Sequence, residues 1–119
     1  MREAETAAVE SPEQPSVLAG AAIRVMDGFY EGLEVPIDRD RVVIGRGKGA
    51  DVMIAEPTMS RAHAAVGCEG PSFFVQDLGS TNGTLVNGGR FERTALRDGD
   101  EIQLGKLRLR VKLPSSRPV

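Results

Sequence analysis

The stretch Leu-Arg-Leu-Arg-Val-Lys-Leu at residues 107–113 decides the fold class of this sequence. Its apolar residues occupy alternate positions and its cations lie between them, so an extended chain would be apolar on one face and charged on the other. This period of two predicts a β-strand that is half-buried against a core. Asp98-Gly99, a strong turn dipeptide, leads into another apolar segment at 101–105, which is expected to be the preceding strand.

Short apolar segments of the same kind recur along the chain, separated by glycine, proline, aspartate or asparagine about every 8 to 12 residues. The expected strands cover residues 22–26, 33–37, 41–45, 52–54, 63–68, 73–77, 84–86, 89–93, 101–105 and 107–113. No stretch of about ten residues keeps the helical period, and no repeat of fixed length appears. The sequence therefore predicts an all-β sandwich of two packed, mostly antiparallel sheets with the longer loops at its ends.

Composition divides the chain of 119 residues into one folded domain and two flanking segments. Residues 1–21 are rich in Ala, Glu, Pro and Ser. This composition predicts a flexible acidic arm, because it buries too little apolar surface to offset the entropy of ordering. Residues 114–119 contain two prolines and are expected to form a C-terminal tail. The folded domain is therefore expected to span residues 22–113.

Charge and cysteine content limit the classes of function. The net charge is −2, and acidic and basic residues balance across 22–113, so no long-range field favours nucleic acid or an anionic membrane surface. The single Cys68 cannot form an internal disulfide, and no Cys/His group suits zinc, so neither a metal nor a cofactor is expected. Because no apolar run is long enough for a secretory signal or a membrane span, the sequence predicts a cytoplasmic protein.

The loop sequence Gly-Arg-Gly-Lys-Gly-Ala-Asp at 45–51 displays two cations, Arg46 and Lys48. Its glycines permit a close approach of another backbone. The spacing of these glycines does not fit a nucleotide-binding loop, no Ser or Thr follows Lys48, and no helical pattern comes after it. The loop is therefore interpreted as flexible and cationic.

The sole histidine closes the loop sequence Glu-Pro-Thr-Met-Ser-Arg-Ala-His at 56–63. Ser60 and His63 could be a nucleophile and its base, as in a serine hydrolase, but no G-x-S-x-G elbow surrounds the serine. His63 also begins an apolar segment, which favours a structural histidine. Ser60 beside Arg61 can instead be half of a phosphate clamp, and Arg46 on a neighbouring loop would complete it.

Polar residues are also concentrated at 77–88, where the sequence is Asp-Leu-Gly-Ser-Thr-Asn-Gly-Thr-Leu-Val-Asn-Gly. Its two Asn-Gly pairs, at 82–83 and 87–88, are strong turn formers, so two successive hairpin turns would explain much of the segment. The hydroxyls and amides of Ser80, Thr81 and Asn82 exceed what these turns require. An amide such as that of Asn82 could read the main chain of a partner.

Together these segments strongly resemble the forkhead-associated (FHA) domain, a module that reads phosphothreonine. The resemblance extends across 22–113 and rests on motifs in family order: Gly45-Arg46, Ser60-Arg61-Ala62-His63, Ser80 to Gly83 with Asn87-Gly88, and Arg-Asp-Gly-Asp-Glu-Ile-Gln-Leu-Gly at 97–105. It implies a sandwich of eleven strands, one more than the ten expected above. It also implies that loops at one end hold the ligand and that the domain has no catalytic activity.

The resemblance also implies roles for individual residues. The expected phosphopeptide-binding residues are Arg46, Ser60, Arg61, Thr81 and Asn82. The residues expected to shape the loops are Gly45, His63, Gly83 and Asn87. The implied partner is a phosphothreonine-containing protein or peptide in a Ser/Thr kinase pathway.

Two further alternatives remain at this point. Thr6 lies in an acidic context within the arm, and some members of the family bind their own phosphorylated N-terminal tail, so Thr6 is a candidate phosphosite for self-capture. The other alternative is a sandwich scaffold that has lost phosphate binding.

Overall fold

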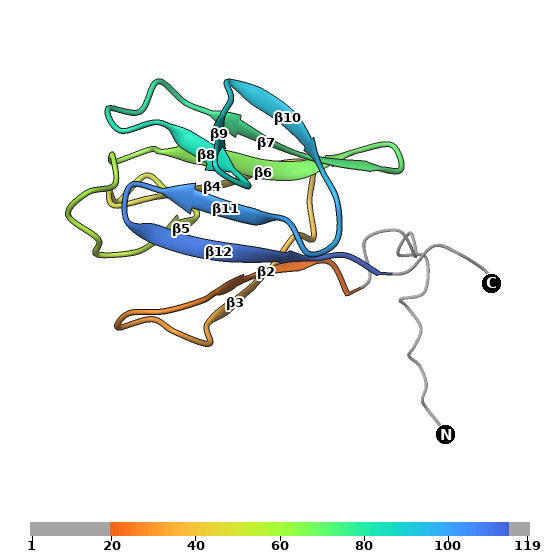
Figure 1. The fold of residues 1–119 in the computed structure, drawn as a ribbon, viewed down its shortest axis with the longest axis horizontal. Coiled ribbons are helices and arrows are strands. Elements are labelled where there is room, and N and C mark those ends of the chain that lie inside the picture. Colours follow the sequence, from red (N-terminus) through yellow and green to blue (C-terminus); the bar gives the residue numbers. More distant parts are fainter. Residues whose placement is uncertain (1–19, 115–119) are drawn as a thin grey trace.

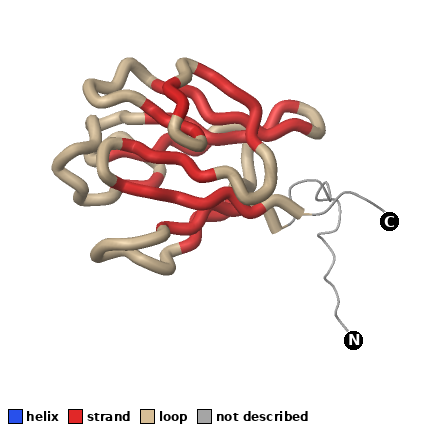
Figure 2. Tube along the Cα trace, viewed as in Figure 1, coloured by secondary structure: helices blue, strands red, loops and turns tan. Residues whose placement is uncertain are grey.

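Two packed β-sheets make up residues 20–114, the part of the chain that the computed structural model describes (Figure 1). Figure 2 shows that strands and loops account for this whole part, with no helix. One sheet has five strands in the order β10-β7-β6-β4-β5, and the other has six in the order β3-β2-β12-β11-β8-β9. All neighbouring strands pair antiparallel except β4 and β5, which are parallel. The predicted all-β sandwich is confirmed.

The strands are short, as the sequence predicts. Those of the five-stranded sheet, in spatial order, are β10 (Arg93–Leu96), β7 (Ser72–Asp77), β6 (Ala64–Glu69), β4 (Val42–Gly45) and β5 (Val52–Met53). Those of the six-stranded sheet are β3 (Glu34–Pro36), β2 (Ala22–Val25), β12 (Leu107–Lys112), β11 (Glu101–Leu104), β8 (Thr84–Val86) and β9 (Gly89–Arg90).

The alternating segment at 107–113 supplies the centre of the six-stranded sheet. Strand β12 pairs with β2 on one side and β11 on the other, so that Leu109 lies between Val25 and Ile102. All three side chains are almost fully buried, whereas Arg110 between the buried positions is exposed. The period of two therefore marks the boundary between core and solvent along this strand.

The expected strand at 89–93 is wrong, because two strands in different sheets occupy this region. Strand β9 ends at Arg90 in the six-stranded sheet, and β10 begins at Arg93 in the other sheet. Phe91 and Glu92 carry the chain across: Phe91 N–H donates to the Thr84 carbonyl, and the Glu92 carbonyl accepts from Asp77 N–H. This division raises the strand count of the described part to the eleven that the resemblance implied.

The β4–β5, β5–β6 and β7–β8 loops, which carry most of the polar motifs, lie at one end of the sandwich, on the left in Figure 1. The β11–β12 turn marks this end, and the Thr58 hydroxyl accepts a hydrogen bond from Lys106 N–H of that turn at 2.7 Å. Ala22 and Lys112, which pair with each other, lie at the opposite end of their strands. The two ends of the described chain are therefore remote from the polar loops.

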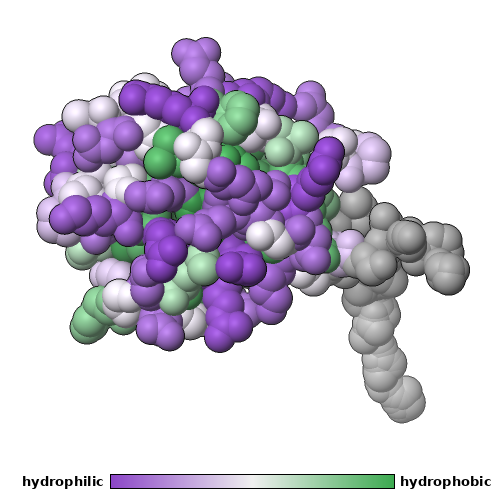
Figure 3. All heavy atoms as spheres, viewed as in Figure 1, coloured by the Kyte–Doolittle hydropathy of each residue, from purple (hydrophilic) through white to green (hydrophobic). Residues whose placement is uncertain are grey.

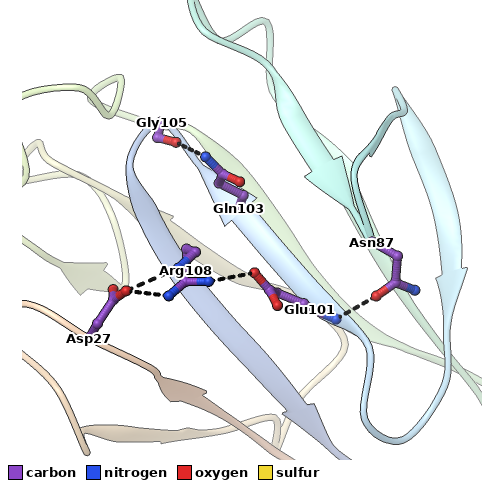
Figure 4. Close-up of polar contacts among 6 residues, drawn as sticks. All are labelled: Asp27, Asn87, Glu101, Gln103, Gly105 and Arg108. Atoms are coloured by element: carbon purple, nitrogen blue, oxygen red, sulfur yellow. Dashed lines mark hydrogen bonds and ion pairs between the residues drawn. The ribbon is translucent and has the colours of Figure 1, made fainter.

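A row of polar contacts covers the outer face of the six-stranded sheet (Figure 4). The Arg108 guanidinium donates to Asp27 at 2.6 Å and to Glu101 at 3.3 Å. At the far end of the row, Asn87 has a positive φ of 51° in the β8–β9 turn. Its side chain donates to Asp100 and accepts from Glu101 N–H, at 2.9 and 3.0 Å. Asn87 therefore joins the β8–β9 turn to the start of β11.

We predict that Asn87→Ala lowers the free energy of unfolding by about 1–2 kcal/mol. The change removes two side-chain hydrogen bonds and places alanine, which disfavours a positive φ more than asparagine does, at this position. Chemical denaturation measures the change. Asn87→Gly is the matched variant, since glycine keeps the backbone conformation and loses only the hydrogen bonds, so about half of the destabilisation is expected. Wild-type stability in both variants would contradict this role.

Candidate functional site

Two glycines, one at the end of β4 and one in the loop after it, lie in close contact with the loop before β6. An ideal Cβ on Gly45 would lie 1.9 Å from the Arg61 carbonyl oxygen, and one on Gly47 would lie 2.8 Å from the Arg61 Cβ. Both glycines are therefore required by this close approach. Backbone hydrogen bonds of 3.0 Å, from Arg46 N–H to the Ser60 carbonyl and from Gly47 N–H to the Arg61 carbonyl, hold the loops together. This contact brings Arg46 next to Ser60 and Arg61.

His63 is fully buried and uses both of its ring nitrogens. Nδ1 accepts from Ser60 N–H at 3.0 Å, so the ring proton is on Nε2, which donates to the Gly83 carbonyl at 2.8 Å. The Ser60 hydroxyl oxygen accepts from Thr81 N–H at 3.0 Å. Each of these atoms is thus engaged with main chain, whereas a serine nucleophile needs its hydroxyl paired with the histidine. The geometry gives no support to the serine hydrolase alternative.

Ser80 belongs to a hydrogen-bonded cluster within its own loop. Its hydroxyl donates to Asp77 and accepts from Gly83 N–H at 2.9 Å. The expectation that this hydroxyl exceeds the needs of the turn is therefore wrong. Burial by itself would raise the pKa of Asp77, but hydrogen bonds from Ser80, Thr84 and the Gly79 amide outweigh it, and the pKa lies below its ordinary value. The charged carboxylate is the form that organises this loop.

Asn82 connects its loop to the one that carries Ser60. Its Nδ2 donates to the Thr58 carbonyl at 2.8 Å, and Thr58 in turn donates its hydroxyl to Glu56 at 2.6 Å. The hydrogen bonds from Thr58 lower the pKa of Glu56. Sequence reasoning missed Glu56 and Thr58. Their local signal is a carboxylate two positions before a hydroxyl, which is common in turns and does not reveal the contact to Asn82.

A pocket of about 630 Å³ lies against the two cationic loops. Arg46, Lys48 and Arg61 contribute its charge, and glycines contribute much of the remaining wall. Within residues 20–114 none of these cations forms an ion pair with an acidic side chain. Arg46 is oriented by a hydrogen bond from Nε to the Met59 carbonyl at 2.8 Å, which leaves its two terminal nitrogens for a ligand. The pocket suits a compact anion with several acceptor oxygens.

The structure gathers most of the predicted site residues but not all of them. The residues at or next to this loop cluster are Gly45, Arg46, Ser60, Arg61, His63, Thr81, Asn82 and Gly83. Asn87 lies at the other end of β8, so it shapes a different turn. Thr6 lies outside the described residues. Within 20–114 no group of three or more His, Cys, Asp or Glu side chains is placed to hold a metal ion.

Comparison with known families identifies the fold. Residues 42–105 match the model of the FHA domain, and this range contains the β4–β5, β5–β6 and β7–β8 loops that form the cluster. The chain belongs to the FHA domain family. The resemblance seen in the motifs is therefore confirmed. Residues 20–114 include no helix with the length and apolar character needed to cross a membrane.

Two curated relatives of this FHA chain are bacterial regulators by name. The glycogen accumulation regulator GarA of Mycolicibacterium smegmatis is 38% identical over 92 residues, which are 76% of this chain and 58% of GarA. The oxoglutarate dehydrogenase inhibitor of Corynebacterium diphtheriae is 38% identical over 104 residues, 87% of this chain and 73% of the inhibitor. The matched part of the chain thus spans between about half and three quarters of these relatives.

Solved FHA domains share the architecture. One, from a structural and functional analysis of phosphothreonine-dependent FHA domain interactions, has a TM-score of 0.75 at 30% identity and covers 82% of this chain and 99% of its own. The FhaA FHA domain, complexed with the intracellular domain of Rv3910, has a TM-score of 0.71 at 32% identity and covers 77% of this chain and 99% of its own.

We predict that His63→Ala lowers the free energy of unfolding by about 2–4 kcal/mol, because it leaves a cavity and strips the Ser60 amide and the Gly83 carbonyl of their buried partner. Thermal and chemical denaturation test this. The control is Arg110→Ala, an exposed change on the outer face of β12 that should shift stability by less than about 0.5 kcal/mol. Equal stability of the two variants would show that the histidine is not a structural link.

Proposed function

We propose that this FHA domain is a phosphothreonine-dependent peptide-binding module without catalytic activity of its own. The observation that carries the proposal is the convergence of Arg46, Ser60 and Arg61 through the close contact at Gly45. Two guanidinium groups line one pocket, and Ser60 lies directly before Arg61 on one of the two loops that meet there. This is the chemistry that a phosphate monoester requires.

The hydrogen-bonding state of these side chains fits phosphate. Ser60 Oγ accepts from the Thr81 amide, so its own O–H remains to donate to a phosphate oxygen. Arg46 has its Nε occupied and its terminal nitrogens available, which fixes the direction of the guanidinium before ligand arrives. A phosphothreonine brings about −1.5 to −2 charges and three acceptor oxygens, which these groups and Arg61 can satisfy. The loops are thus organised in advance for a dianion.

The neighbouring loop supplies contacts to the rest of the phosphorylated residue and its chain. Thr81 is exposed beside Ser60 and would line the phosphothreonine pocket. The Asn82 amide is oriented by the Thr58 carbonyl, and its second N–H and its carbonyl oxygen can pair with the main chain of a peptide. Gly45, His63 and Gly83 position these loops, whereas Asn87 would act only on stability.

The names of the relatives suggest the kind of cellular process in which the module acts. GarA is a regulator and the corynebacterial relative is an inhibitor, so a role in regulation by protein binding is the natural extension to this chain. We place the module in a cytoplasmic Ser/Thr kinase pathway, with a phosphothreonine-containing protein as partner and no cofactor. A scaffold that has lost phosphate binding is the alternative, and failure to bind any phosphothreonine peptide would favour it.

We predict that Arg46→Ala and Ser60→Ala abolish detectable binding of a phosphothreonine peptide while the domain stays folded. Each charge-assisted hydrogen bond contributes about 1.5–3 kcal/mol, so losing even one partner weakens binding about tenfold to a hundredfold. Titration calorimetry measures the affinity, and the unphosphorylated peptide should not bind.

The control for these variants is Arg110→Ala. It removes the same charge from an exposed position on the outer face of the sheet, far from the loops. It should bind the phosphopeptide as the wild type does. Unchanged affinity in Arg46→Ala or Ser60→Ala would overturn the assignment of that residue to the phosphate.

We further propose that the arm expected at residues 1–21 is flexible before Gly20, that the chain after Pro114 forms the tail expected at 114–119, and that the arm can deliver phosphorylated Thr6 to the site of the same chain. Ala21 belongs to the fold instead, because it is 3% exposed and its carbonyl accepts from Ile37 N–H at 2.9 Å. It lies next to Ala22, at the opposite end of β2 from the ligand loops. Residues 6 to 22 could extend over about 50 Å, which is enough to run along a domain of this size.

If the arm reaches the site, phosphorylation of Thr6 will block an external phosphothreonine peptide, and removal of that phosphate will restore binding. Competition in a fluorescence-polarisation assay measures this. The phosphorylated Arg46→Ala variant, observed by NMR, is the control in which the arm should stay free. An open site in the Thr6-phosphorylated wild type would rule out self-capture.

A further inference from the structure

A further arginine, Arg90, lies against the β7–β8 loop outside the proposed phosphate pocket. An ideal Cβ on Gly83 would lie 2.7 Å from Arg90 Nε and 2.8 Å from its Cζ, so the guanidinium packs directly on the backbone of this loop. Arg90 does not line the pocket of about 630 Å³ to which Arg46, Lys48 and Arg61 contribute. It is therefore a separate cation beside the ligand loops.

The fold fixes the position of this arginine. Arg90 pairs with Leu85 across β8 and β9, and Phe91 N–H donates to the Thr84 carbonyl at 3.1 Å. These contacts hold the end of β9 beside the start of β8, at the end of the sandwich that carries the β7–β8 loop. Gly83 is fixed as well, because it is buried and its N–H and its carbonyl both form hydrogen bonds. The guanidinium thus rests on a rigid surface.

The charge of Arg90 is available to a ligand. Its side chain is exposed, and within residues 20–114 it forms no ion pair, not even with Glu92, the carboxylate nearest to it in sequence. In the same range, the arginines whose side chains donate hydrogen bonds are Arg39, Arg46, Arg93 and Arg108. Hydrophilic side chains cover most of this end of the sandwich (Figure 3). The surface therefore suits a charged ligand group.

The separation between Arg90 and the phosphate site suits one short peptide. Thr81 N lies 3.0 Å from Ser60 Oγ, and Gly83 follows two residues later in the same loop. With about 3.8 Å between consecutive Cα atoms, the Arg90 guanidinium lies at most about 16 Å from the Ser60 hydroxyl. An extended peptide advances about 3.3 Å per residue, so about five residues cover even the largest separation. A segment with its phosphate at Ser60 can therefore place another side chain at Arg90.

We propose that Arg90 binds a glutamate or aspartate side chain of the same phosphorylated segment and so selects acidic phosphothreonine sequences. The inference rests on the proposed function of the neighbouring pocket. A guanidinium can hold a carboxylate through two parallel hydrogen bonds, and its contact with Gly83 limits the side-chain freedom that is lost on binding. The sequence before Thr6 meets this requirement, since Glu3 and Glu5 lie within three residues of it.

The test uses the full chain, unphosphorylated at Thr6, and alanine-rich phosphothreonine peptides. Each peptide carries one glutamate or one glutamine, placed in turn at each position up to about five residues before or after the phosphothreonine. Titration calorimetry should find a position at which glutamate strengthens binding about threefold to fivefold over glutamine, and high salt should reduce this advantage. In Arg90→Gln the advantage should vanish. The glutamine peptide should bind the wild type and Arg90→Gln within about twofold, because salt screens the attraction of Arg90 for the phosphate.

Charge reversal separates a direct contact from a change in folding. In Arg90→Glu, lysine at the preferred position should strengthen binding over glutamine and glutamate should weaken it, which a damaged loop would not produce. Arg110→Gln is the matched control, since it removes the same charge from an exposed position of the same sheet. It should keep the full glutamate advantage.

Two results would overturn the inference while phosphothreonine binding stands. One is the absence of any position at which glutamate is preferred. The other is a glutamate advantage that survives in Arg90→Gln, and its loss in Lys48→Gln instead would assign the carboxylate to the cationic loops. Failure of every phosphopeptide to bind the wild type would overturn the proposed function, and this inference with it.

Discussion

One buried imidazole joins the two sheets at the end of the sandwich where the polar loops meet. His63 directly precedes β6 in the five-stranded sheet, and Gly83 directly precedes β8 in the six-stranded sheet. The hydrogen bond between them therefore crosses from one sheet to the other, while the second ring nitrogen fixes the Ser60 amide. Because the ring is fully buried, water does not compete for either bond. The positions of Ser60 and of Thr81, which donates to it, follow from this link.

The period of two was sufficient to predict the fold class, because each buried strand must separate core from solvent along its length. The same pattern could not predict where the chain changes sheets. Arg90 and Arg93 flank a two-residue crossing with no proline and no turn dipeptide, so the alternation reads as one strand. Gly67 shows a similar limit: it lies within β6, yet an added Cβ would meet the Asp40 carbonyl oxygen at 1.8 Å. Such contacts depend on tertiary packing and leave no local pattern.

The candidate site was predictable where function is encoded in a motif and unpredictable where it depends on contacts between loops. Arg46, Ser60 and Arg61 belong to motifs, and the structure brings them together. Thr58 and Tyr30 carry no motif, and their partners Asn82 and Ala55 are 24 and 25 residues away. Asn-Gly at 87–88 correctly indicated a tight turn, and both residues have a positive φ in it. A dipeptide encodes the shape of a turn but not the end of the sandwich at which it lies.

The low net charge of the chain implies that affinity for phosphate and selectivity among phosphothreonine sequences come from different groups. The net charge of −2 gives no attraction for a dianionic ligand beyond a screening length of about 10 Å, so binding must arise from contacts inside the loop cluster. If Arg46 and Arg61 hold the phosphate as proposed, they meet the same group in every phosphothreonine sequence and cannot distinguish one partner from another. Selection among sequences must then come from other groups on the surrounding loops. Met53 lines the pocket between the cationic loops and is 58% exposed, and Phe29 is 94% exposed. Both side chains therefore contribute less to the stability of the fold than buried side chains of the same size would.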